Sequence, residues 1–139
     1  AAVDPEASLP PEVLKALTDG KKFTVMSIDP KGFDAVPTYA WKVLASKEID
    51  DAKIRKDVVD AIKKAVAKEA LPAECFIPRH AISTQYEAKK YVLVICFQCS
   101  QMLVYIGGEQ KQTIPISGSA KATLDKILGN ADPVAAGGK

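Results

Sequence analysis

The sequence predicts an α+β fold: an antiparallel sheet of about five strands, a long amphipathic helix packed on one face, and short N- and C-terminal helices. Apolar side chains recur at helical spacing across residues 54–66. The second half of the chain alternates apolar runs with short polar turns, as hairpins do. Such strand runs favour antiparallel pairing with helices on one face.

Proline, glycine and aspartate delimit the expected helices. The Pro10-Pro11 pair suits a helix start and Gly20 suits its end. The Asp50-Asp51 pair can cap the long helix, which we expect to run for about five turns. It should end near Pro72, because proline disfavours helix in the residue before it. A last helix is expected from Ser117 or Ser119 to Gly129.

The strands are expected where apolar and β-branched residues gather between turn residues. The strand expected at residues 91–99 begins with YVLVICF, which is apolar on both faces and predicts a central strand covered on both sides. The expected strands are residues 22–28, 39–45, 75–84, 91–99, 102–106 and 113–116.

The composition is that of one small domain. The chain has 139 residues, of which 47% are hydrophobic and 26% charged, and this length suffices to bury a core. We expect a single domain over residues 1–139, with loose tails at residues 1–9 and 130–139. No apolar run approaches the roughly 20 residues that a membrane-spanning helix needs, so we expect no transmembrane span.

The charge argues against a nucleic-acid partner. The net charge is +2, from 19 basic and 17 acidic residues, whereas nucleic-acid-binding domains usually carry a clustered basic face and a high pI. We therefore expect the partner to be a protein or a small ligand.

The first residues and the cysteines favour export. The chain opens with Ala1-Ala2-Val3-Asp4-Pro5, which suits a protein whose signal peptide was removed at small residues. Clustered cysteines suit an oxidising compartment. We expect a periplasmic or secreted protein, with a lipid anchor in a longer form as one variant and a cytoplasmic location as the alternative.

All three cysteines and the only histidine fall between residues 75 and 99. One interpretation is a zinc site made by Cys75, His80, Cys96 and Cys99, since three thiolates and an imidazole suit tetrahedral zinc. The objection is geometric. Cys96 and Cys99 have opposite parity, as have Cys75 and His80, so each pair would face opposite sides of an unbroken strand.

Other interpretations of the same window stay open. A disulfide between Cys75 and Cys99 would fit a hairpin centred near residues 87–88 and would leave Cys96 as a thiol. The cysteines could instead be inert core residues. A redox pair of Cys96 and Cys99 lacks the following helix that usually lowers a thiol pKa. A thiol enzyme would pair Cys96 with His80, but no orienting group lies near in sequence.

Arg79 stands between Pro78 and His80 in an unusual tripeptide. It is a candidate for binding an anion or a partner. The alternative is an ion pair near the sheet edge.

The segments Cys75-Phe-Ile-Pro-Arg-His80 and Cys96-Phe-Gln-Cys99 resemble a family of small, uncharacterised bacterial proteins, often exported or lipoprotein-like. Residues 39–44 look similar as well. The resemblance implies an exported bacterial protein and supplies no activity. Our hypothesis is a non-enzymatic, exported binding domain with a structural cysteine cluster. The alternative is a Cys/His metal-binding protein of the zinc type, with a thiol enzyme third.

Overall fold

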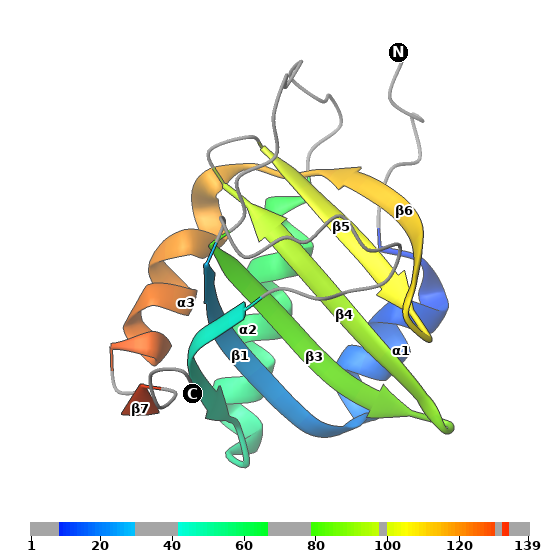
Figure 1. Cartoon of the computed structure of the whole chain (residues 1–139), viewed down its shortest axis with the longest axis horizontal. Coiled ribbons are helices and arrows are strands. Elements are labelled where there is room, and N and C mark those ends of the chain that lie inside the picture. The colour runs from blue at the N-terminus through cyan, green and yellow to red at the C-terminus, as the bar shows by residue number, and fades with distance from the viewer. Residues whose placement is uncertain (1–8, 30–41, 67–78, 98–99, 130–131, 134–139) are drawn as a thin grey trace.

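A computed structural model (Figure 1) describes residues 9–29, 42–66, 79–97, 100–129 and 132–133 of the chain. None of the helices in these ranges is both long enough and apolar enough to cross a membrane. The predicted strand residues 39–41 and 75–78 lie outside them, as do Cys75 and Cys99.

The described residues build one antiparallel sheet of seven strands in the order β6-β5-β4-β3-β1-β2-β7. All neighbouring strands pair antiparallel. The N-terminal strand β1 lies between β3 and β2, so the two halves of the chain share one sheet. The strands are β1 (Lys21–Asp29), β2 (Lys42–Glu48), β3 (His80–Tyr86), β4 (Lys89–Cys96), β5 (Gln101–Ile106), β6 (Glu109–Pro115) and β7 (Asp132–Pro133).

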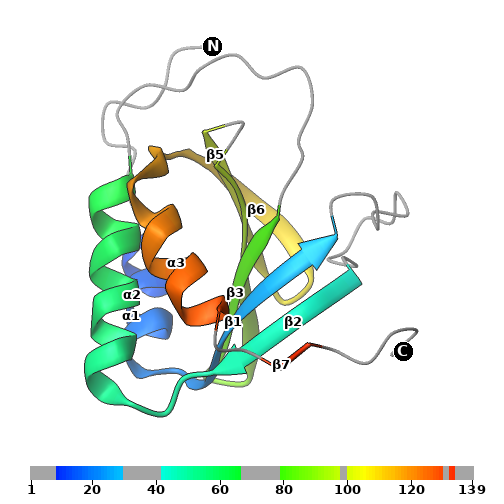
Figure 2. The ribbon, with the colours of Figure 1, turned by 90° about the vertical axis from the view of Figure 1, so that its left-hand side faces the viewer.

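The described residues form three α-helices, which lie on one side of this sheet, as Figure 2 shows. They are α1 (Pro11–Asp19), α2 (Ala52–Ala65) and α3 (Lys121–Leu128), and a short 3₁₀ turn, η1 (Gly118–Ala120), leads into α3. Helix α2 contacts both α1 and α3. The predicted cap of α2 is confirmed, since Asp51 Oδ1 accepts from the backbone N–H groups of Lys53 at 2.8 Å and Ile54 at 3.1 Å.

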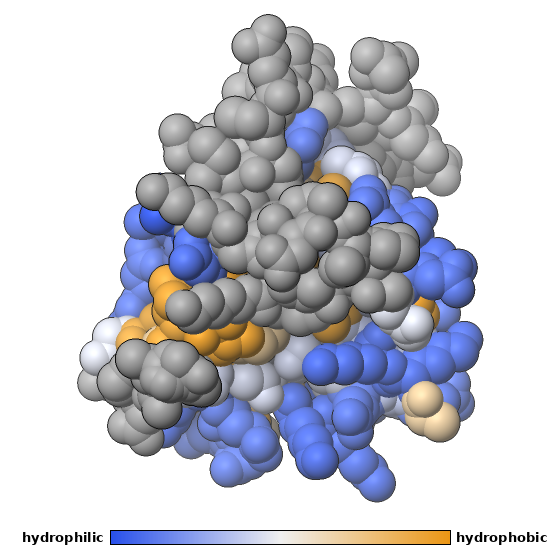
Figure 3. Space-filling view, in the orientation of Figure 1, coloured by the Kyte–Doolittle hydropathy of each residue, from blue (hydrophilic) through white to orange (hydrophobic). Residues whose placement is uncertain are grey.

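The sheet buries apolar side chains on both of its faces. The larger cluster joins the sheet to the helices and includes Phe23, Leu93 and Ile62. A second cluster lies on the opposite face, because side chains alternate along a strand. It is made by Met26, Ile28, Ala81, Val92, Val94 and Tyr105. Figure 3 looks onto this second face and shows apolar side chains in the area of β1 and β2.

Strand β4 is buried on both faces of the sheet. It lies between β3 and β5, and each residue from Tyr91 to Cys96 is buried. The prediction of a central strand covered on both sides is confirmed.

The predicted fold class, a sheet of about five strands packed by one long amphipathic helix, is wrong. The described sheet has seven strands, and its helical side is shared by three short helices, the longest with 14 residues. Helix α2 stops at Ala65 because Val66 has an extended ψ of 124° and pairs with Ile116 as a β-bridge. Strand β6 begins with polar residues from Glu109, which carry no alternating pattern, and is held by pairing with β5.

The chain ends contribute packed and paired residues to the fold. Leu9 belongs to the helix-side cluster. Asp132 and Pro133, from the expected C-terminal tail, pair with Ser46 and Ala45 of β2. The edge of the sheet beside β2 is thus covered by a two-residue strand.

Candidate functional site

The structure places the two described members of the cysteine–histidine window on opposite faces of the sheet. His80 pairs with Ile95 across β3 and β4, and directly paired residues share a face. Ile95 belongs to the helix-side cluster. Cys96, one residue further along β4, therefore faces the other side with Val94. The side chains of His80 and Cys96 do not converge on a common site.

Cys96 is buried and disulfide-bonded. The prediction that Cys96 remains a thiol beside a Cys75–Cys99 disulfide is therefore wrong. A cysteine in a disulfide offers neither a thiolate to zinc nor a nucleophile to a substrate while the bond lasts. Within the described ranges, no three His, Cys, Asp or Glu residues are grouped so as to hold a metal ion.

His80 instead joins β3 to α3 through a carboxylate. Its Nε2 lies 2.6 Å from Oδ1 of Asp125, and Nζ of Lys121 donates to Oδ2 of the same carboxylate at 2.7 Å. Burial raises the pKa of Asp125, but hydrogen bonds from Lys121 and His80 outweigh it and hold that pKa below its ordinary value. The sequence reading missed Asp125. The one signal in the sequence was that Lys121 and Asp125 lie four residues apart on a helix, a spacing at which opposite charges can pair.

His80 is 6% exposed, and its ring meets that of Phe97 edge-on with 5.1 Å between centroids. Its Nδ1 is buried and has no hydrogen-bond partner among the described residues. Neither a thiol nor a hydroxyl in that part of the chain bonds to His80. The His80–Asp125 pair therefore tethers α3 to the sheet. A His–Asp catalytic pair needs a nucleophile beside it, and the described residues place none there.

Arg79 precedes His80 with an exposed side chain. Its backbone completes the sheet, since its N–H donates to the Ile95 carbonyl at 3.3 Å and its carbonyl accepts from Ile28 at 3.0 Å. The ion pairs found in the described ranges do not include Arg79.

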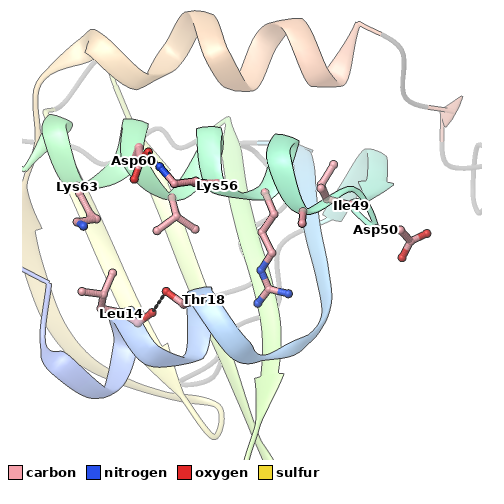
Figure 4. A pocket seen from close by; sticks show the side chains of 10 residues that line it. Leu14, Thr18, Ile49, Asp50, Lys56, Asp60 and Lys63 are labelled. Carbon is pink, nitrogen blue, oxygen red and sulfur yellow. Dashed lines mark hydrogen bonds and ion pairs between the residues drawn. The ribbon is translucent and has the colours of Figure 1, made fainter.

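A groove of about 470 Å³ runs between α1 and α2 (Figure 4). It has apolar walls from both helices, and charged side chains of α2 stand at its edges. The apolar and polar lining is Leu14, Thr18, Ile49, Ala52 and Val59, and the charged lining is Asp50, Arg55, Lys56, Asp60 and Lys63. Lys56 and Asp60 neutralise each other in an ion pair of 3.0 Å.

Arg55 is held in one position beside this groove. Its Nε donates to the Leu17 carbonyl at 2.8 Å and its Nη2 to the Ala16 carbonyl at 3.4 Å. The guanidinium also lies 4.8 Å from the ring centroid of Phe23. Burial lowers the pKa of Arg55 and Asp19 opposes this, but an arginine stays charged at any physiological pH. The structure thus fixes a cation at the side of a partly apolar groove.

The sequence reading missed this groove because its residues are ordinary ones for helix surfaces. Arg55 is one of two arginines in a chain rich in lysine, which was the available signal.

No protein family, curated protein or solved structure compared with the chain matches it. The resemblance of Cys75–His80 and Cys96–Cys99 to an exported bacterial family therefore stays a prediction.

Proposed function

We propose that this chain is a non-enzymatic binding domain that holds a small amphipathic anion, such as an organic carboxylate, in the groove between α1 and α2. The observation that carries the proposal is the guanidinium of Arg55, fixed beside apolar side chains. Binding sites for small molecules are typically apolar clefts with a few placed polar groups.

The hydrogen bonds of Arg55 support this role. A guanidinium has five N–H donors in a fixed fork. Two donor nitrogens, Nε and Nη2, bond to carbonyls at the end of α1, which leaves further N–H groups for a carboxylate. Because these bonds and Phe23 already orient the side chain, a ligand would lose little conformational entropy in engaging it.

The apolar walls support an amphipathic ligand over a simple anion. Leu14 of α1 and Val59 of α2 face the same space. Their contact would favour a ligand with a hydrocarbon or aromatic body attached to its charged group.

Export remains part of this proposal. The disulfide at Cys96 supports it, because disulfides persist in oxidising compartments and are rare in the cytosol of most cells.

The experiment is a titration of the ¹⁵N-labelled protein with 4-phenylbutyrate, followed by amide chemical shifts. We expect shifts confined to α1, α2 and residues 49–50, and much weaker shifts with uncharged 4-phenylbutanol. Substituting Thr18→Trp should abolish the shifts by filling the groove. Lys15→Trp, an exposed change on α1 away from the lining, should not.

A second substitution separates charge from shape. Arg55→Lys keeps the cation but loses the planar fork, so binding should weaken about tenfold. Equal binding of the alcohol, or shifts that map outside the groove, would refute the proposal.

A further inference from the structure

A second groove runs along the opposite side of α2, between α2 and α3. It consists of two hollows of about 340 Å³ and 460 Å³. Both hollows are lined by Asp57, Thr123 and Lys126, so they are continuous. Helix α2 has 14 residues and is therefore about 21 Å long. A groove that follows two helices suits an elongated occupant better than a compact molecule.

One end of this groove is apolar. Ile49, Ile54 and Ile127 line the first hollow. Ile54 is 41% exposed, although its helical spacing predicts a buried position. Within the described ranges it is one of two large apolar side chains with such exposure. An exposed isoleucine inside a groove offers apolar area that an occupant would remove from water.

The charged part of the remaining lining is mostly positive. Three lysines, Lys47, Lys53 and Lys64, face two aspartates, Asp57 and Asp60. Asp60 is already paired with Lys56, which lines the other groove. The charge complementary to this surface is therefore negative, and charge complementarity steers association and selects partners.

We infer that the α2–α3 groove docks an acidic amphipathic helix of a partner protein. Such a helix would place an apolar stripe over Ile54 and Ile127 and acidic side chains against the lysines, the usual arrangement of a helix bound in a groove. The inference does not depend on the α1–α2 groove, since only Ile49 and Asp60 line both.

The probe is a synthetic 18-residue peptide with leucines at helical spacing on one face and glutamates elsewhere. We expect its addition to shift the amides of α2 and α3 and to leave those of β5 and β6 unchanged. Binding should weaken as salt rises, because exposed charges are screened. A matched peptide with lysine in place of glutamate should not bind.

Variants of the protein locate the site. Ile54→Asp and the double change Lys47→Glu with Lys53→Glu should each weaken binding about tenfold or more. Lys15→Glu, an exposed change on α1, should leave it unaffected. Circular dichroism of each variant checks that it is folded.

Three results would overturn the inference. These are peptide shifts that map outside α2 and α3, equal binding of the lysine peptide, and affinity unchanged by Ile54→Asp in a folded variant. Anionic phosphatidylglycerol vesicles provide the last comparison. If they bind through Ile54 while the acidic peptide does not, the surface recognises a membrane and the inference is wrong.

Discussion

Single residues join elements that are far apart in this chain. Asp125 is half-exposed, yet its two carboxylate oxygens hold the buried His80 of β3 and Lys121 of its own helix. Tyr91 of β4 is buried, and its hydroxyl donates to Oε2 of Glu12 on α1 at 3.2 Å. Both contacts involve titratable groups, so each makes stability depend on pH.

Substituting Asp125→Asn should lower the free energy of unfolding by about 1 kcal/mol at neutral pH, a value reduced for solvent exposure. The pKa of Asp125 lies below its ordinary value of 3.8 in the folded protein. A carboxylate with a lowered pKa stabilises the fold above its ordinary pKa, and this stabilisation is lost as the pH falls through the folded value.

Urea unfolding at pH 7 and at about pH 3 measures this difference. The gap between wild type and variant should shrink in acid. Asp57→Asn, an exposed position with no hydrogen bond or ion pair in the described ranges, is the control. An undiminished gap in acid would contradict the assignment.

At alkaline pH the buried tyrosines should destabilise the fold. Burial raises the pKa of Tyr91, with Glu12 adding to the effect, and burial also raises the pKa of Tyr105. A group with a raised folded pKa stabilises below its ordinary pKa, here 10.0, and that contribution is lost as the pH rises through the folded value.

Thermal melts between pH 8 and pH 11 should therefore show a falling Tm. Tyr91→Phe removes one titrating group, so its Tm should fall less steeply with pH. A variant with the same slope as wild type would show that ionisation of Tyr91 does not contribute.

At the scale of elements, the hairpin turns differ in how well their residues suit them. Gly107 and Gly108 close the β5–β6 turn with φ of 63° and 89°, which glycine adopts without steric cost. The β3–β4 turn makes the same demand on Glu87 and Ala88, with φ of 51° and 66°. The β3–β4 turn is strained because both of its residues carry a Cβ.

Substituting Ala88→Gly should therefore raise the free energy of unfolding by about 1 kcal/mol. The matched control is Ala122→Gly, at an exposed position in α3, which should lower it by about 1 kcal/mol because glycine weakens helices. Chemical denaturation of both variants tests the assignment. If both variants lose the same free energy of unfolding, the assignment of strain to Ala88 is wrong.

For the whole molecule, the sheet is the boundary between two apolar clusters. Ile82 belongs to the helix-side cluster and Ile28 to the other, and each is 1% exposed. The strands that carry them, β1 and β3, pair directly, with Val25 opposite Ile82.

Substituting Ile82→Ala or Ile28→Ala should cost about 2–5 kcal/mol in either case, because each leaves a cavity in a closed cluster. The two changes are chemically identical and differ only in the face of the sheet. If Ile28→Ala costs less than about 0.5 kcal/mol, as surface changes do, the second face does not act as a core.

The fold and the candidate sites were predictable to different extents. Local signals located the start of α1 at Pro11 and the cap of α2 at Asp51, and the apolar run of β4 indicated a strand covered on both sides. The small net charge of +2 and the residue types of the helix surfaces carried no sign of either groove. Arg55 acquires its fixed position from α1 carbonyls and Phe23, more than 30 residues away.

The sequence by itself determined the elements whose signals are local: caps, turns and apolar periodicity act within a few residues. The tertiary structure alone decided that β1 lies between β3 and β2, that α2 ends where Val66 meets Ile116, and that His80 faces Asp125 while Cys96 faces away. Strand order and helix packing depend on contacts between distant segments, and a shift of one residue moves a strand side chain to the opposite face.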